Sequence, residues 1–146
     1  MLHLSRYLFL AGATPFVVLG LAHAMATPLA AGDRKGLSPR APDLADAMAR
    51  TSPRLTNRTD MWRAWVGFNL SHSLGAFVFG AFVITVGRSA GSYGELASIA
   101  VPFASVVSTA YLGLAVKYWF RIPILGCALS VGSFLASWAL LVLGGP

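Results

Sequence analysis

Four long apolar stretches follow one another along the chain, and the charged residues lie between them. None of the four contains Asp, Glu, Lys or Arg, and each is close to or above the roughly 20 residues that a membrane-spanning helix needs. None alternates between polar and apolar positions as the strands of a membrane barrel do. We therefore predict an all-α fold, an integral membrane antiparallel four-helix bundle. The predicted spans are residues 7–30, 64–87, 96–116 and 122–144.

The first stretch also has features of a secretory signal peptide. Arg6 precedes the apolar run, and Ala22-His23-Ala24 has the small-x-small pattern of a cleavage site. The apolar run is, however, longer than the 7–15 residues of a typical signal-peptide core. We therefore expect it to remain as the first span.

Composition supports a membrane location for the whole chain, residues 1–146, as a single transmembrane domain. Of the 146 residues, 56% are hydrophobic and 11% are charged, and the mean hydropathy is +0.68. Soluble domains carry about 25% charged residues, so a soluble enzyme is excluded. The single Cys127 excludes a disulfide framework and a CxxC-type zinc or redox site.

The basic residues predict the orientation of the chain. Seven of the 11 Lys and Arg residues lie in the loop 33–63, and two more, Lys117 and Arg121, lie between the third and fourth spans. Only Arg6 and Arg88 lie on the opposite side. The positive-inside rule therefore places loop 33–63 in the cytoplasm and both termini outside. The formal charge of +6 does not indicate nucleic-acid binding, because the cations lie between apolar spans.

Loop 33–63 also contains a predicted short helix over residues 42–50. Pro42 stands near its start and Asp43 in its first turn, as helix N-termini favour. Leu44 and Met48 share one face. A basic loop with such an interfacial helix suits the anionic headgroups of the inner leaflet. Alternatively, the cations serve only as a topology signal, or the loop binds a partner.

Small residues spaced four apart occur in every span and predict close helix packing, because lipid supplies no hydrophobic force between helices. These pairs and triplets are Gly20/Ala24, Gly67/Ser71/Gly75, Ser105/Thr109/Gly113, Gly126/Ser130 and Gly132/Ala136. The phenylalanines of the last three spans do not fit a single core face. Some of them are therefore expected to face lipid, a pigment, a quinone or another subunit.

The spans contain no acidic or basic residue other than histidine. Proton-coupled pumps generally use an intramembrane carboxylate, so this class is disfavoured. Hydrolysis by a Ser-His-acid triad is disfavoured for the same reason, since no acid is available to orient a histidine. Cys127 lacks a positioned base and is expected to be a core residue. We predict no catalytic residue.

His23 and His72 are the two histidines inside the spans. Each lies about 12–14 Å from the predicted cytoplasmic boundary, at 1.5 Å per residue. Because the first two spans run antiparallel, the two imidazoles can meet at one depth. Thr27 lies one turn from His23, while Asn69 and Trp65 lie three and seven residues from His72. These five residues form the candidate cofactor-binding site.

Three interpretations of this site remain open. The imidazoles join the first two helices through hydrogen bonds, each worth on average about 0.6 kcal/mol in membranes. Alternatively, they are axial ligands of haem b or ligands of a metal, although two histidines without carboxylate or thiolate are an incomplete metal site. In the third interpretation they bind a quinone, a chlorin-type pigment or a lipid headgroup. We predict no metal ion.

Two segments of the sequence resemble a pattern found in small four-helix bacterial inner-membrane proteins. The segments are Gly-Leu-Ala-His-Ala-Met-Ala-Thr (residues 20–27) and Trp-Val-Gly-Phe-Asn-Leu-Ser-His-Ser-Leu-Gly (residues 65–75). The resemblance implies a four-helix fold in the bacterial inner (plasma) membrane. It implies no activity, because none is assigned to those proteins.

Our leading hypothesis is a non-enzymatic accessory or structural subunit of a larger respiratory or photosynthetic inner-membrane complex. Its partners would be the lipid bilayer and other membrane subunits, with no required cofactor. The alternative is a redox or ligand-binding protein that holds haem b, a metal or a quinone between His23 and His72. A channel made by oligomerisation is the least favoured, because the spans lack charged residues.

Overall fold

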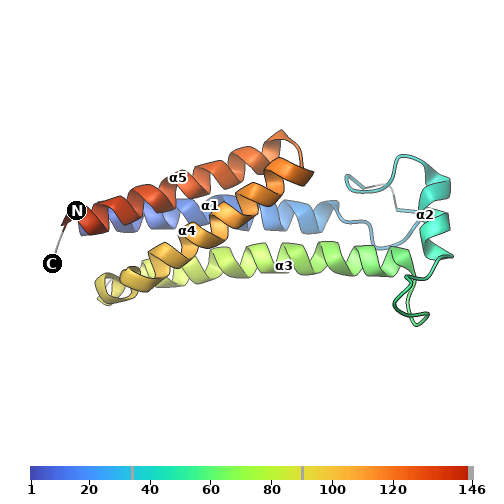
Figure 1. Cartoon of the computed structure of the whole chain (residues 1–146), viewed down its shortest axis with the longest axis horizontal. Coiled ribbons are helices and arrows are strands. Elements are labelled where there is room, and N and C mark those ends of the chain that lie inside the picture. Colours follow the sequence, from blue (N-terminus) through green and yellow to red (C-terminus); the bar gives the residue numbers. More distant parts are fainter. Residues whose placement is uncertain (34, 90, 145–146) are drawn as a thin grey trace. The chain divides into compact units, whose positions relative to one another are not determined.

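The computed structural model describes residues 1–33, 35–89 and 91–144, and these residues form five helices and no strand (Figure 1). The helices are α1 (Leu2–Ala26), α2 (Pro42–Ala49), α3 (Met61–Arg88), α4 (Tyr93–Tyr118) and α5 (Arg121–Gly144). All but α2 are long and apolar enough to cross a membrane. The prediction of an all-helical membrane bundle is confirmed, and the chain is a multi-pass membrane protein.

Helix α1 ends earlier than the predicted span. It stops at Ala26, whereas the apolar stretch suggested residue 30. The cause is Pro28, because a residue that precedes proline is disfavoured in the α conformation. The Thr27 hydroxyl donates a hydrogen bond to the His23 carbonyl oxygen at 2.9 Å and so satisfies one of the last carbonyls of the helix.

The other long helices extend beyond their charge-free stretches. α3 begins three residues earlier than predicted, at Met61, because Asp60 stands before it as a cap. The Arg63 backbone N–H donates to Asp60 Oδ1 at 2.8 Å, which satisfies one free donor of the first turn. Charged residues thus belong to the helix ends, where they can lie in the headgroup layer.

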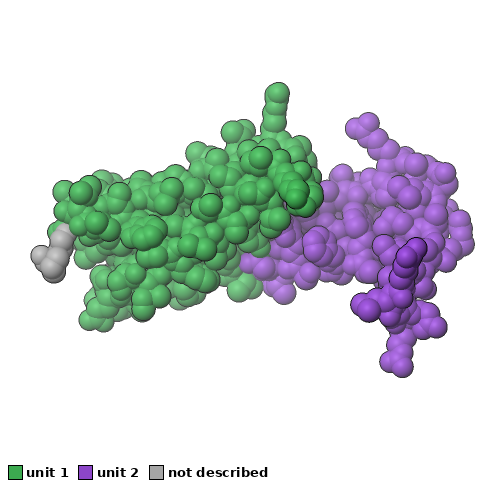
Figure 2. All heavy atoms as spheres, viewed as in Figure 1, with its two compact units in different colours: residues 1–19, 76–146 green, residues 20–75 purple. Residues whose placement is uncertain are grey.

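The chain forms two compact units (Figure 2). Unit 1 contains residues 1–19 and 76–146, and unit 2 contains residues 20–75. Unit 1 holds one hydrophobic core to which all four long helices contribute. Its largest buried side chains are Phe9, Phe16, Phe79, Tyr93 and Phe134.

Aromatic rings and glycines fit together in unit 1. The Phe134 ring lies 5.6 Å from the Phe9 ring and 6.2 Å from the Phe79 ring, measured between ring centres. A Cβ at Gly12 would lie 2.5 Å from Phe134 Cε1. A Cβ at Gly80 would lie 2.6 Å from Val17 Cγ2 and 3.2 Å from its backbone nitrogen. These glycines therefore permit α1 to approach α3 and α5 closely.

Buried serines satisfy their hydroxyls across the helices of unit 1. Ser130 donates to the Gly12 carbonyl oxygen at 2.8 Å, and Ser137 donates to the Ser5 carbonyl oxygen at 2.9 Å. At the end of α3, the Arg6 guanidinium donates to the Gly87 carbonyl oxygen. Unit 1 thus joins an aromatic core to hydroxyl–carbonyl hydrogen bonds between helices.

Unit 2 consists of the end of α1, the loop with α2, and the first half of α3. Helix α2 runs across the direction of that half of α3 (Figure 1). Ala45 of α2 is buried, while Leu44 is 51% exposed. Asp33 closes the turn after α1, where its Oδ2 accepts hydrogen bonds from the Ala30 and Leu29 N–H groups. These donors hold the pKa of the Asp33 carboxyl below its ordinary value.

The small-residue seams agree only in part with the prediction. The Gly126/Ser130 seam is confirmed, since Ser130 bonds to α1 and a Cβ at Gly126 would meet Leu19 Cδ1 at 2.5 Å. At Gly67, Gly113 and Gly132 nothing lies within 4 Å of an added Cβ, so these positions form no close contact between helices within the described part of the chain. The physical reason is the rotation of each helix about its own axis, which turns these glycines outward.

Candidate functional site

His23 and Asn69 join the end of α1 to the first half of α3 within unit 2. His23 Nε2 lies 2.9 Å from Asn69 Oδ1, although the residues are 46 positions apart. The Asn69 amide is oriented by a second bond, in which Nδ2 donates to the Trp65 carbonyl oxygen at 2.8 Å. Oδ1 can only accept a hydrogen bond, so His23 Nε2 must carry the proton. The neutral imidazole is therefore the Nε2–H tautomer.

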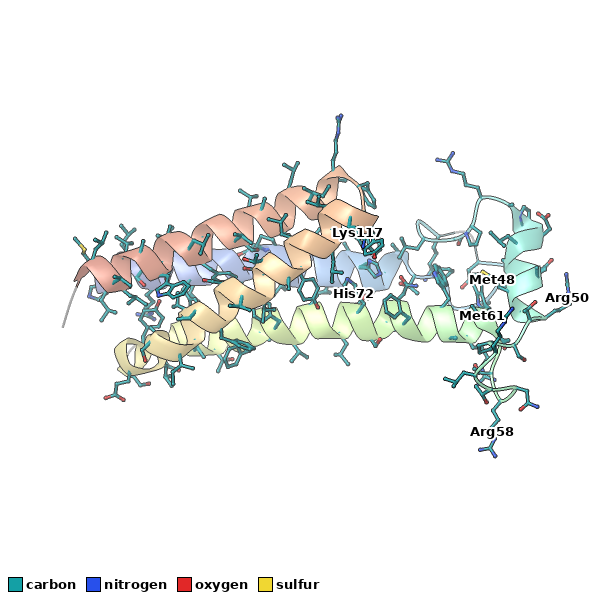
Figure 3. All side chains as sticks on the ribbon, in the orientation of Figure 1. Met48, Arg50, Arg58, Met61, His72 and Lys117 are labelled. Carbon is teal, nitrogen blue, oxygen red and sulfur yellow. The ribbon has the colours of Figure 1, made fainter. Side chains whose placement is uncertain are left out.

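His72 lies beside His23, one turn farther along α3 than Asn69. The ring centres of the two imidazoles are 5.2 Å apart, with planes inclined at 65°. The Phe68 ring stacks on the His72 imidazole, with ring centres 6.4 Å apart and planes inclined at 14°. Figure 3 labels His72 on α3. The structure therefore brings His23, Asn69 and His72 together.

Thr27 and Trp65 each form a hydrogen bond with a residue of this cluster, and each bond involves a backbone carbonyl oxygen. The Thr27 hydroxyl bonds to the His23 carbonyl oxygen, and the Trp65 carbonyl oxygen orients Asn69. The Trp65 ring packs against the Trp62 ring, with centres 5.2 Å apart. Of the five predicted site residues, three thus meet through their side chains and two position them.

A haem does not fit between the two imidazoles in this geometry. An iron with an imidazole on each side, at metal–nitrogen distances of about 2 Å, needs about 6 Å between ring centres, with the macrocycle between them. The centres of the His23 and His72 rings are 5.2 Å apart, and Asn69 Oδ1 accepts a hydrogen bond from His23 Nε2–H. The residues present therefore do not match a bis-histidine haem site.

The donor set is also small for a metal ion. Within the described part of the chain, no group of three or more His, Cys, Asp or Glu side chains is placed to hold one. Metal sites in proteins usually have at least three protein ligands. The chemistry that these residues supply is hydrogen bonding by imidazole and amide in an apolar setting.

Three residues of unit 2 were not predicted from the sequence. Ser73 is buried and donates to the Asn69 carbonyl oxygen at 2.9 Å, and Phe68 stacks on His72. Trp62 is only 4% exposed, and its Nε1 has no hydrogen-bond partner among the described residues. A sequence signal was available for Ser73 and Phe68. Each lies four residues from a site residue, Ser73 from Asn69 and Phe68 from His72.

One side of α3 in unit 2 presents small residues outward. Gly67, Ser71 and Gly75 are exposed, and an added Cβ at Gly67 would have nothing within 4 Å. We call these three residues the small face of α3. Phe68, 67% exposed, and Leu74, 61% exposed, stand beside it. The small face is therefore a shallow strip between larger apolar side chains.

No protein-family model matches the chain, and comparison with curated proteins and with solved structures found no match either. Its function must therefore be inferred from its own residues and geometry.

Proposed function

We propose that this chain is a small, non-catalytic accessory subunit of a larger inner-membrane assembly, on which a transmembrane helix of another subunit packs. The proposal depends mainly on one observation, the outward position of the small face of α3. As in the sequence-based hypothesis, the candidate assemblies are respiratory or photosynthetic complexes.

The physical argument concerns close approach between helices. In lipid, helices associate where small residues let their backbones come close together. The chain uses such a seam internally at Gly126 and Ser130 but leaves Gly67, Ser71 and Gly75 exposed. Against acyl chains a row of small residues gains little, whereas a partner helix can pack into the strip between Phe68 and Leu74. A helix of another subunit is therefore the ligand that this face suits best.

The proposed location is the bacterial inner membrane, with both termini periplasmic and loop 33–63 cytoplasmic. Nine Lys and Arg residues on one side against two on the other support this orientation. Cysteines placed singly at Arg50 and Gly91, in a Cys127→Ala background, test it with a membrane-impermeant thiol reagent. In spheroplasts, we expect labelling at position 91 and not at position 50.

The decisive test is the native mass of the tagged chain extracted from its own membranes in mild detergent. We expect co-purification of other chains in a particle much larger than a small homo-oligomer. Gly67→Leu should release the chain from this particle without lowering its own thermal stability, because position 67 has open space and leucine, like alanine, favours a helix over glycine.

Ala110→Leu is the matched control for that substitution. Ala110 is exposed on α4 between Val106 and Leu114, which are 66% and 53% exposed, so the added bulk faces lipid among large side chains. We expect this variant to remain in the particle. A wild-type chain that runs as a monomer or small homo-oligomer, or a Gly67→Leu variant that stays assembled, contradicts the proposal.

The proximity of His23 and His72 favours a second candidate, a ligand-binding membrane protein. The ligand class that fits is a quinone, because its carbonyl oxygens accept hydrogen bonds from imidazole N–H groups. His72 is partly exposed and can be reached by a ligand, whereas Asn69 is buried. Solvent extraction of the purified protein should then yield a quinone that is lost in His72→Ala. Equal quinone content in both proteins rules out this candidate.

A further inference from the structure

The segment between α2 and α3 is a closed loop. The Met61 backbone N–H donates to the Thr51 carbonyl oxygen at 2.8 Å and so ties the two ends of residues 51–61 together. The Thr51 hydroxyl donates to the Ala47 carbonyl oxygen at 2.7 Å, which fixes the base of the loop to the end of α2. Residues 51–61 are called the closed loop below.

Turns hold the tip of the closed loop in place. The Thr56 N–H donates to the Pro53 carbonyl oxygen at 3.2 Å, and the Arg58 N–H donates to the Thr56 hydroxyl oxygen at 3.2 Å. The loop extends to one side of the start of α3, and Arg58 points away from both helices (Figure 3). The tip is therefore presented on a defined backbone.

The tip combines one bare apolar side chain with two cations. Leu55 is 94% exposed, the highest value among the exposed large hydrophobic residues of the described chain. Arg54 and Arg58 flank it and are exposed, and neither forms an ion pair within the described residues. Exposure of a leucine side chain to water is unfavourable. A leucine between two arginines is instead suited to a surface with an anionic outer layer and an apolar layer beneath it.

An anionic bilayer surface has that combination of properties. Peripheral segments bury apolar side chains about 5–10 Å into the boundary between headgroups and acyl chains, while their cations attract anionic headgroups. The closed loop directly precedes α3, so it lies at the end of a candidate membrane span. It also projects to one side of the start of α3 rather than along the helix axis (Figure 3), which is where lipids beside a spanning helix would lie.

We propose that the closed loop is a docking site for anionic phospholipid, in which Leu55 inserts at the acyl boundary while Arg54 and Arg58 bind headgroup phosphates. The proposal concerns a local site, which differs from a topology signal spread over the whole basic loop. It is independent of the proposed partner helix on α3.

The test uses the full-length chain with one dye on the closed loop. In a Cys127→Ala background, Asn57→Cys carries a polarity-sensitive fluorophore and leaves Leu55 and both arginines intact, since Asn57 is exposed. The protein is reconstituted into vesicles of phosphatidylcholine alone or of equimolar phosphatidylcholine and phosphatidylglycerol. Both leaflets have the same composition, so the direction of insertion does not affect the result.

We expect blue-shifted emission and quenching by brominated acyl chains only in the phosphatidylglycerol vesicles, both reversed by molar salt. Each cation near an anionic surface contributes about fivefold, so Arg54→Gln/Arg58→Gln should lower the ratio of docked to undocked loop by about 30-fold. Leu55→Ser should reduce quenching by the brominated chains while the salt dependence remains.

Arg40→Gln/Arg50→Gln is the control, because it removes the same charge from exposed positions outside the closed loop. It should retain most of the shift. Three results overturn the proposal: an equal loss of signal in this control, an equal shift without phosphatidylglycerol, and water-like emission in every vesicle. A shift seen only in native membranes, and absent from vesicles, would assign the loop to a protein partner instead.

Discussion

Units 1 and 2 contain parts of the same two helices, yet they are stabilised in different ways. Among the described residues, the buried hydrophobic side chains lie in unit 1, except Ala45, Trp62 and the ring of Pro28. Unit 1 is packed from aromatic rings and close-approach glycines. In unit 2, which has few buried apolar side chains, a hydrogen bond between His23 and Asn69 joins α1 to α3, and the buried Trp62 N–H has no hydrogen-bond partner among the described residues. The difference indicates that stability comes mainly from unit 1, while unit 2 carries the candidate sites.

Such a division is common in proteins, because regions with few buried apolar contacts open more easily and are used for binding. Lipid does not compete for hydrogen bonds as water does, but single interhelical hydrogen bonds still contribute little on average. Substitutions in the two units should therefore differ in size, and the following predictions run from the largest effect to the smallest.

Removal of Phe134 tests the core of unit 1. The side chain is 0% exposed and contacts Phe9 and Phe79, so Phe134→Ala should lower the free energy of unfolding by about 2–3 kcal/mol, mainly through the cavity that it leaves, since lipid is as apolar as the core. Denaturation of the purified protein in mixed micelles measures this change. Phe103→Ala, at a ring that is 51% exposed, is the control and should cost about 1 kcal/mol. Equal losses in the two variants would show that the aromatic core does not dominate.

The glycines give a paired test of the close-approach and open positions. Gly80→Ala places a Cβ against Val17, including its backbone nitrogen at 3.2 Å, and should destabilise the fold by about 1–3 kcal/mol. Gly67→Ala in unit 2 meets no atom and should stabilise α3 by up to about 1 kcal/mol, since alanine favours helices. The same micelle denaturation compares both. Effects of the same sign would contradict the difference in packing.

A double-mutant cycle measures the hydrogen bond of unit 2. His23→Ala, Asn69→Ala and the double variant should give a coupling energy of about 0.6 kcal/mol, and no more than about 1.7 kcal/mol. The small value is expected because the separated helices find other partners for these groups. A coupling comparable to the loss at Phe134 would show that unit 2 is as important for stability as unit 1.

The smallest effect concerns the turn after α1. Because the pKa of Asp33 is lowered in the folded chain, its contribution to the turn is present above the ordinary carboxyl pKa and is lost as pH falls through the lowered value. The amide NMR signals of Leu29 and Ala30 should therefore titrate with a midpoint below that ordinary value. Asp33→Asn should abolish this titration. A midpoint at or above the ordinary value contradicts the hydrogen bonds to the two N–H groups.

Much of the architecture follows from the sequence alone. Backbone groups in hydrocarbon must bond within the segment, so four apolar stretches of sufficient length could only be four helices. The cap at Asp60 and the short helix α2 also follow from local residue chemistry. The end of α1 was predictable too, since Pro28 is a local signal that overrides the apolar run.

The candidate site was partly visible in the sequence. Antiparallel neighbouring spans placed His23 and His72 at similar depth, and the structure puts their rings 5.2 Å apart. The protonation of His23 was not visible, because it depends on how the Asn69 amide is turned by the Trp65 carbonyl oxygen. The closed loop could not be predicted from the sequence either, since its two ends are joined by a backbone hydrogen bond between Met61 and Thr51.

The sequence by itself determined the number, the approximate limits and the membrane character of the long helices. Only the tertiary structure decided which side of each helix faces inward. Gly126 and Gly67 belong to the same kind of small-residue pattern, yet one meets Leu19 and the other is open. The reason is that lipid is as apolar as a protein core, so hydrophobicity along a membrane helix does not mark its inner face. That face is set by the fit of particular side chains, such as Phe134 over Gly12.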